Sequence, residues 1–358
     1  MTNGCNTNKV LILSTTARGS RTATGQLIDS IFSSIDNVQT LSLHAGHKGG
    51  SNHLESSFTV RAPRKVCREI RGFDPSLIYV RPTSSHLGYN LVSWLLLCWC
   101  RIPFVVHLMD DEERDVSTTG FAERRIFGLY LRWLLKRAAD VFTVSPGMSR
   151  AFESRYGRPS VVLANYPLTF TSKAEFRNEM RIGYFGSLDA RMNRDSVRRL
   201  SLVISSLAQQ GSAVSLDIYT REQYSDWAQA HCASKVVRVL PQVPSNAYRD
   251  TLAEYAVLLV AYNFDQLSIA YCRYSIANKL ADYLATSAKI VVVGPTEIET
   301  VKLCRDHNLA TVLDDETQND LESILEKETR VNVSVRCAEY VKAMELEEGM
   351  ERWKAIFQ

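Results

Sequence analysis

Three polar side chains share one face of a helix that the sequence predicts over residues 275–285. Lys279, Asp282 and Tyr283 stand at positions i, i+3 and i+4, so they lie above one another on the helix surface. The first turn also carries Asn278, and its free N–H groups and dipole favour a phosphate, to which Lys279 adds a point charge. Asp282 could accept hydrogen bonds from sugar or ribose hydroxyls. The same spacing is typical of an exposed ion pair without a ligand, and spacing alone leaves both interpretations open.

A second group of chemically useful residues adjoins a hydrophobic strand predicted at residues 103–108. His107 stands near the end of this strand, and Asp110 and Asp111 come directly after it. Ligands of open parallel sheets bind beyond the carboxyl ends of the strands, so a carboxylate here is well placed for function. It could orient a hydroxyl group or take its proton. The alternative is a solvated acidic loop that caps the next helix.

A basic residue and a glycine lie together in the loop that follows the first predicted strand, at residues 9–14. They are Arg18 and Gly19, and the family resemblance described below implies that this loop faces the acceptor. The loop lacks the G-x-G-x-x-G pattern, so it does not indicate a dinucleotide site. An ordinary solvated loop is an equally good interpretation.

A similar arrangement begins the second half of the chain. The strand and turn MRIGYFGSL, at residues 180–188, include Gly186, and Asn193 and Arg194 open the helix that follows. The family resemblance described below implies that a basic group at this position meets a diphosphate. The alternative is a basic turn with no ligand.

Hydrophobic, β-branched runs alternate with helical stretches along the whole chain, which predicts an α/β fold with doubly wound parallel sheets. The length of 358 residues suggests two domains. Ser275 is the predicted N-cap of the helix described first, and the run at 289–294 predicts a strand covered on both faces. Residues 44–57 contain three histidines, but their spacing lacks the carboxylate or cysteine companion typical of a metal site, so they predict a surface loop. A single last helix is predicted over residues 335–357.

Charge is unevenly distributed along the chain. Residues 1–178 contain 22 Lys and Arg against 14 Asp and Glu, whereas residues 179–358 contain 20 against 25. A basic first half suggests an anionic partner. No basic run alternates with aromatic residues as in nucleic-acid grooves, so an anionic membrane surface is favoured over nucleic acid. The helix predicted at residues 121–137 carries five basic residues beside aromatic and aliphatic ones, and it could rest on such a surface or be a core helix with basic edges.

The eight cysteines show no paired spacing except Cys98 and Cys100, which lie in an apolar stretch and are expected to be buried thiols. The sequence therefore predicts a cytoplasmic protein. The apolar run at residues 91–100 is about half as long as a membrane span.

Three segments of the chain resemble retaining GT-B glycosyltransferases of the family-4 type. The first is similar to their donor-binding helix, N/S-K-L-x-E-Y-L-A, with Asp282 in place of the usual Glu. The second, VHLMDD, is similar to the H-x-M-D-D segment of bacterial polysaccharide glycosyltransferases. The third is similar to the stretch that closes their N-terminal domain. The matching residues are Asn278, Lys279, Leu280, Tyr283, Leu284 and Ala285; His107, Asp110 and Asp111; and Ala139, Asp140, Val144, Ser145, Tyr156, Gly157 and Asn165.

This resemblance implies a GT-B fold of two doubly wound, Rossmann-like domains that face a cleft. The first domain, residues 1–168, would bind the acceptor, with a C-terminal helix at 340–358 packing back onto it. The second domain, residues 180–335, would bind a UDP- or GDP-linked sugar. The implied reaction transfers the sugar to a glycan or lipid-linked acceptor, with retention and without a metal or other cofactor, at or near the inner face of the membrane.

The resemblance also implies a set of site residues. His107, Asp110 and Asp111 would be catalytic, and Arg18 and Gly19 would lie on the acceptor side. The donor would contact Asn193, Arg194, Gly186, Asn278, Lys279, Asp282 and Tyr283.

Two departures from the family pattern keep other functions open. Asp282 replaces the usual Glu, and residues 263–273 lack the E-x-F-G turn that often precedes the donor helix. A sugar-nucleotide 2-epimerase of the same fold and a non-catalytic GT-B partner subunit are the alternatives.

Overall fold

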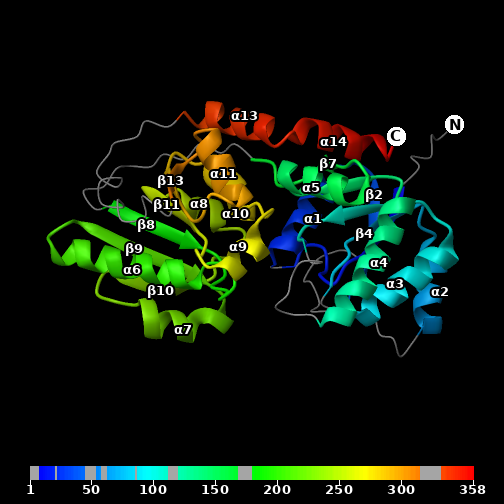
Figure 1. Ribbon diagram of the computed structural model, residues 1–358, viewed down its shortest axis with the longest axis horizontal. Helices are drawn as coiled ribbons and strands as arrows, with labels where there is room; N and C mark the ends of the chain where they lie inside the picture. The colour runs from blue at the N-terminus through cyan, green and yellow to red at the C-terminus, as the bar shows by residue number, and fades with distance from the viewer. Residues whose placement is uncertain are drawn as a thin grey trace. The chain divides into compact units, whose positions relative to one another are not determined.

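The computed structural model describes residues 8–20, 22–44, 54–57, 63–84, 87–111, 120–167, 180–314 and 332–358. The chain forms two compact units, one of residues 1–165 and 344–358 and the other of residues 166–343. Each unit is an α/β structure built on one parallel sheet (Figure 1). The predicted linker at residues 168–179 lies outside the described residues.

The first unit contains a seven-stranded parallel sheet in the order β3-β2-β1-β4-β5-β6-β7. The chain adds strands outward in one direction from β1 to β3 and then in the other direction from β4 onward, so the sheet is doubly wound with its switch point between β1 and β4. The prediction of a loop over residues 44–57 is partly wrong, because β3 pairs with β2 there. The strands are β1 (Asn8–Leu13), β2 (Val38–His44), β3 (Leu54–Ser57), β4 (Leu77–Val80), β5 (Phe104–Leu108), β6 (Val141–Thr143) and β7 (Val161–Val162).

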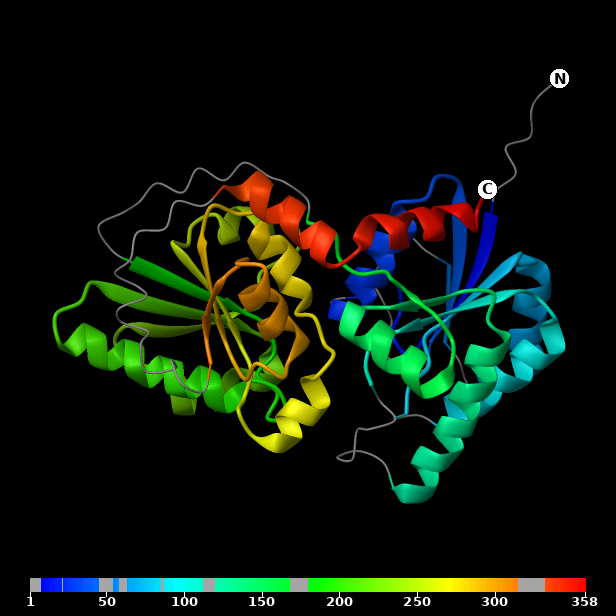
Figure 2. The ribbon, with the colours of Figure 1, turned by 45° about the horizontal axis from the view of Figure 1, so that its top comes forward.

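Helices cover both faces of this sheet (Figure 2). They are α1 (Ala23–Ser33), α2 (Pro63–Phe73), α3 (Leu87–Cys100), α4 (Phe121–Arg137), α5 (Pro146–Tyr156) and the C-terminal α14 (Leu346–Ala355). Trp353 of α14 is fully buried, packs against the rings of Phe32, Tyr79 and Phe142, and donates its indole N–H to the Ile31 carbonyl over 3.2 Å. The last residues of the chain therefore complete the core of its first unit.

The second unit repeats the winding with a six-stranded parallel sheet in the order β10-β9-β8-β11-β12-β13. Its switch point lies between β8 and β11. The strands are β8 (Met180–Phe185), β9 (Val214–Thr220), β10 (Val237–Pro241), β11 (Val257–Ala261), β12 (Lys289–Val293) and β13 (Thr311–Leu313). The predicted strand at 289–294 is confirmed, and its residues from Ile290 onward are buried, as expected for a strand covered on both faces.

Helices α6 and α7 lie on one face of this sheet, and α10, α11 and α13 lie on the other (Figure 1). The helices of this unit are α6 (Arg194–Gln209), α7 (Glu222–Cys232), α8 (Tyr248–Leu252), α9 (Gln266–Cys272), α10 (Asn278–Leu284), α11 (Glu299–Asp306) and α13 (Val333–Ala343). The prediction of one last helix over 335–357 is wrong, because α13 and α14 are separated at Glu345, which has a left-handed backbone with φ +55°.

Two smaller predictions also need correction. Ser275 does not cap the donor helix, since α10 begins at Asn278 with Ala277 as its N-cap. Cys98 is exposed rather than buried, because it lies on the outer side of α3. No helix in the described part of the chain is both long and apolar enough to cross a bilayer.

Candidate functional site

The candidate donor site lies in the second unit and is centred on Lys279 in the first turn of α10. Its ammonium nitrogen lies 4.0 Å from the centre of the Tyr184 ring, so it rests on the electron-rich face of this ring. Tyr184 is fixed in turn, since its hydroxyl donates to the Ser187 carbonyl over 2.7 Å and accepts from the Asn193 amide over 2.9 Å. The ring therefore supports the lysine at a set position.

The ammonium of Lys279 is half-buried and forms no hydrogen bond or ion pair with any described residue. Burial lowers its pKa from 10.5 to about 7. No ion pair joins Lys279 to Asp282, although both side chains are described, so the exposed ion pair considered from the sequence does not form. A half-buried cation that contacts an aromatic ring but no described anion is incompletely compensated, and an anionic ligand would supply the missing negative charge.

Gly186 keeps the space beside this ammonium open. It follows β8 at the carboxyl edge of the sheet, and its N–H donates to the Tyr219 carbonyl over 3.0 Å. A Cβ atom at residue 186 would come within 3.0 Å of the Lys279 nitrogen. A side chain there would occupy the volume next to the charge, so glycine leaves room for a ligand to approach.

Asn193 reaches this group of residues, but the guanidinium of Arg194 points elsewhere. Asn193 is buried and contacts Tyr184, as described above. Arg194 donates through Nε to the Leu188 carbonyl over 3.1 Å, and its guanidinium lies 4.8 Å from the centre of the Trp227 ring on α7. The structure therefore joins Asn193 and Lys279 through Tyr184, and it gives Arg194 a packing role on the side of α7.

The N-terminus of α6 is occupied by the chain itself. The amide oxygen of Asn263, just after β11, accepts from the N–H groups of Asp195 and Ser196 over 3.1 and 3.2 Å. These are N–H groups that a phosphate would otherwise use. These two N–H groups of α6 are therefore not available to a ligand, which leaves Lys279 as the candidate contact for an anion in this unit.

Asp282 stands one turn beyond Lys279 and is also half-buried. Burial raises its pKa to about 6, against the opposing effect of the positive charge on Arg249. The carboxylate makes no hydrogen bond or ion pair with a described residue, so its oxygens can accept hydrogen bonds from the hydroxyl groups of a ligand. Its charge helps to raise the pKa of the Tyr248 hydroxyl, which places the tyrosine of α8 nearby.

Tyr283 lies in the core rather than at a surface that a donor could reach. Its side chain is fully buried, and its hydroxyl accepts from the Phe185 N–H over 3.3 Å. This contact fixes α10 against the end of β8, which corrects its predicted role as a direct donor contact. Asn278 is partly exposed at the first position of α10, beside Lys279.

Aromatic rings border the carboxyl ends of β8 and β9. Phe185 and Tyr219 are stacked with their centres 4.6 Å apart and an interplanar angle of 7°. Tyr248 meets Phe185 edge to face at 5.8 Å. Tyr219 and Tyr248 are only partly buried, so these rings give the donor site a partly exposed aromatic border next to Asp282.

The first unit holds the candidate acceptor residues, and Asp110 is the accessible carboxylate among them. Its side chain is 35% exposed and accepts from an Arg81 Nη over 3.0 Å. Arg81 follows β4 and also donates to Thr15, which follows β1, over 3.3 Å. Asp110 therefore lies at the carboxyl edge of the sheet near its switch point, where ligands of doubly wound sheets bind.

Asp111 has a structural role instead. Both of its oxygens accept from Arg155 of α5 over 2.9 Å in a two-pronged ion pair, and the carboxylate is almost fully buried. This contact raises the pKa of the Arg155 guanidinium. The pair anchors α5 to the loop after β5, and it leaves the Asp111 carboxylate without a free oxygen for catalysis.

His107 is a core residue as well. Its side chain is fully buried beside Tyr79 and Phe142, and its Nδ1 lies 2.6 Å from the Tyr79 hydroxyl. Burial lowers its pKa to about 3, so it is neutral at physiological pH. No substrate can reach this ring, which corrects its predicted role as a catalytic residue.

Arg18 also forms part of the framework of the first unit. Its guanidinium is buried, pairs with Asp29 over 2.8 Å, and donates to Thr40 over 3.1 Å and Ser33 over 3.3 Å. It thus ties the loop after β1 to α1 and β2, which removes it from the acceptor side. Gly19 has a φ of +69°, and its N–H donates to the Gly25 carbonyl over 2.9 Å, so it shapes the turn into α1.

Part of the chain matches a known protein family. Residues 32–167 match the family described as "Glycosyl transferase 4-like domain". This part of the first unit is similar to a glycosyl transferase 4-like domain. This finding confirms the predicted resemblance and the prediction that the protein is a glycosyltransferase. A search of curated proteins finds no match.

Solved structures that match the whole chain share its fold. WaaG, a glycosyltransferase involved in lipopolysaccharide biosynthesis, aligns with a TM-score of 0.61 and 11% identity over 97% of this chain and 99% of its own. Sucrose-phosphate synthase from Thermosynechococcus elongatus aligns with a TM-score of 0.57 and 12% identity over 98% of this chain and 96% of its own. An E. coli trehalose-6-phosphate structure bound with UDP-2-fluoro glucose aligns with a TM-score of 0.57 and 10% sequence identity over 98% of each chain. These alignments confirm the predicted GT-B fold.

The first unit contains one arginine at the candidate acceptor site that no sequence motif indicated. Arg81 holds Asp110, and its position directly after a buried strand was the signal available. In the second unit, Tyr184 and Asn263 were missed for another reason. Both act through contacts with residues far away in the sequence, which no local spacing reveals.

Proposed function

We propose that the second unit binds the diphosphate of a nucleotide sugar at Lys279. The observation that carries this proposal is the half-buried ammonium, held on the Tyr184 ring beside Gly186 and without a partner among the described residues. A diphosphate supplies the missing negative charge, and a buried lysine gives strong contacts because little water screens it. The same charge would stabilise the leaving nucleoside diphosphate during transfer.

Asp282 is proposed to hold hydroxyl groups of the sugar or ribose. Its carboxylate is one turn from Lys279 and makes no hydrogen bond or ion pair with a described residue. The aromatic border formed by Tyr219 and Tyr248 offers a surface on which the planar base could stack. UDP is the first donor nucleotide to test, because one structure of similar fold is bound with UDP-2-fluoro glucose, and GDP is the second.

Asp110 is proposed to act on the acceptor. A bond forms between the acceptor oxygen and the anomeric carbon as the bond from that carbon to the diphosphate oxygen breaks. The hydroxyl proton leaves the acceptor, and Asp110 is placed to accept it, since Arg81 holds the carboxylate in position. Lys279 supplies positive charge at the leaving group, which supports a reaction without a metal, and we propose that it proceeds with retention.

The acceptor is proposed to be a glycan or a lipid-linked sugar, and the enzyme is proposed to work in the cytoplasm at a membrane surface. Two observations support this part. The first half of the chain has an excess of basic residues, and one structure of similar fold, WaaG, is involved in lipopolysaccharide biosynthesis.

Calorimetric titration with UDP, GDP and dTDP, and then with their sugars, tests the donor site. We expect at least one nucleoside diphosphate to bind, and Lys279→Met and Asp282→Asn each to weaken it about tenfold or more. Lys302→Met, at an exposed lysine of α11, is the matched control and should bind the nucleotide as the unaltered protein does. No binding by any nucleotide would refute the proposal and favour a non-catalytic partner subunit. A released sugar-nucleotide isomer, with no transfer product, would instead indicate the epimerase.

A further inference from the structure

We propose that the outer surface of α3 and α4 is a docking site for anionic phospholipid, and that a pocket within it holds the headgroup phosphate. This inference rests on the membrane-surface part of the proposed function and assigns it to specific residues. We call this region the α3–α4 surface. It consists of Leu91, Trp94, Leu95, Cys98, Trp99, Arg101, Ile126, Leu129, Trp133 and Arg137.

The α3–α4 surface is unusually apolar for an exposed region. Helix α3 contains no charged residue, and Leu91, Trp94, Leu95 and Cys98 follow one another at helical spacing along its outer side. Leu95 is 60% exposed, and Leu129 of α4 is 69% exposed. Apolar side chains gathered on a surface in this way mark a binding region.

Aromatic contacts join the two helices into one surface. The ring of Trp94 on α3 lies 5.8 Å from that of Trp133 and 6.5 Å from that of Tyr130, both on α4. Trp133 in turn stacks on Phe104 of the sheet, with centres 6.1 Å apart. The exposed leucines therefore stand on a fixed aromatic base, and tryptophan is the residue type enriched where protein meets the lipid headgroups.

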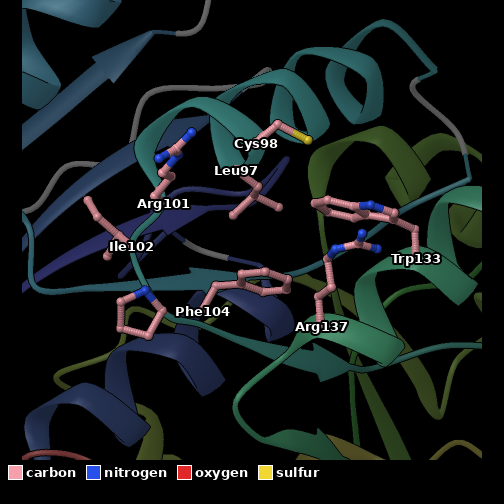
Figure 3. Close-up of a pocket in the computed structure, with 8 residues that line it drawn as sticks. Leu97, Cys98, Arg101, Ile102, Phe104, Trp133 and Arg137 are labelled. Atoms are coloured by element: carbon pink, nitrogen blue, oxygen red, sulfur yellow. The ribbon is translucent and has the colours of Figure 1, made fainter.

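A pocket of about 590 Å³ opens within this surface (Figure 3). Its walls are aromatic and aliphatic, and Arg101 and Arg137 are its two charged residues. Arg137 lies 5.0 Å from the centre of the Trp133 ring, and neither arginine forms an ion pair with a described residue. Two exposed guanidinium groups beside apolar walls suit a phosphate that is attached to acyl chains.

Charge distinguishes a lipid from other occupants of this surface. Helix α4 has five basic residues and a single acidic one, Glu123, and Arg71 of α2 lies 5.0 Å from the centre of the Trp99 ring. A second copy of the chain docked symmetrically would bring these cations against one another. An anionic bilayer instead offers negative charge at the rim and hydrocarbon beneath it.

The pocket is separate from the candidate acceptor residue. Arg101 and Pro103 precede β5, whereas Asp110 follows this strand, so the two sites lie at opposite ends of β5. A phosphate in the pocket is therefore not part of the sugar-transfer reaction. The α3–α4 surface anchors the enzyme, and the carboxyl edge of the sheet remains available to the acceptor.

Vesicle cosedimentation tests this inference. The full chain is mixed with phosphatidylcholine vesicles, with and without phosphatidylglycerol, at low and high salt. We expect binding to the anionic vesicles at low salt and much less at high salt. Arg101→Gln with Arg137→Gln should weaken binding roughly 30-fold, which at about 1.4 kcal/mol per tenfold is about 2 kcal/mol. Leu95→Ser with Leu129→Ser should weaken it at least about tenfold.

Matched variants control for surface change in general. Leu202→Ser with Val335→Ser alters equally exposed apolar residues of the second unit, and Arg198→Gln with Lys354→Gln removes two exposed charges elsewhere. Both should bind vesicles as the unaltered protein does. Equal loss in the control and test variants, or no vesicle binding at low salt, would overturn the inference. UDP titration without vesicles reports on the donor site separately, so failure of one proposal is distinguishable from failure of the other.

Discussion

Lys279 links donor affinity to pH in a way that the structure allows to be calculated. Burial lowers the pKa of this lysine to about 7 in the ligand-free protein, so about half of it is charged at neutral pH. A bound diphosphate favours the charged form and would return the pKa toward its ordinary value of 10.5. If the return is complete, affinity should be roughly 50-fold weaker at pH 9 than at pH 7, because binding then takes up a proton.

The assay is calorimetric titration with UDP between pH 7 and 9, where its terminal phosphate is almost fully ionised. Lys279→Met should bind about 10- to 100-fold more weakly at pH 7, since a hydrogen bond to a charged group is worth about 1.5–3 kcal/mol. Its affinity should also vary little with pH. Lys302→Met should retain both the affinity and the pH dependence of the unaltered protein.

The stability of the ligand-free protein gives a second, independent measurement. The folded pKa of Lys279 is below its unfolded value, so the unfolded state binds more protons between pH 7 and 10.5. The free energy of unfolding should therefore rise with pH over this range, by at most about 1.4 kcal/mol per unit, and Lys279→Met should abolish the rise. UDP affinity that is unchanged by pH and by Lys279→Met would refute the whole line of reasoning.

Further predictions concern the two carboxylates and one buried arginine. Asp110→Asn should lower kcat for sugar transfer at least about tenfold, with little effect on urea denaturation. Asp111→Asn should lower the free energy of unfolding by about 3 kcal/mol, because it removes the ion pair with Arg155. Equal stability of the two variants would contradict this division of roles. Arg336 of α13 donates to carbonyl oxygens at the C-terminal end of α10, the shortest distance being 2.6 Å to Thr286. Arg336→Met should lower the free energy of unfolding by about 3 kcal/mol, and Arg336→Lys by less, in urea titrations followed by circular dichroism; a neutral Arg336→Met variant would show that these bonds contribute little.

The parts of the fold that could be predicted from the sequence are those set by local pattern. The buried strands of both sheets are β-branched runs such as residues 289–293, and α5 begins and ends at Ser145 and Gly157, whose residue types are typical N-cap and C-cap residues. The last helices could not be predicted correctly, because periodicity continues across Glu345 and only the left-handed backbone there separates them.

Site prediction was limited by partners that are distant in the sequence. Asp110 and Asp111 are adjacent and identical in type, yet Arg81 leaves the first partly exposed and Arg155 encloses the second. His107 and Arg18 look equally suitable for chemistry in a one-dimensional reading, but both are buried among core contacts. Lys279 and Asp282 could be found from the sequence because a helix places i and i+3 side by side.

The return of α14 to the first unit has a consequence for synthesis on the ribosome. Trp353 packs against Phe32, Tyr79 and Phe142, which all lie before residue 166, so this part of the core stays incomplete until Trp353 is translated. At about 5–20 residues per second, the roughly 180 intervening residues take on the order of 10–40 s to emerge. During that interval the apolar surface that Trp353 later covers stays exposed, so removing residues from Trp353 onward should destabilise the first unit.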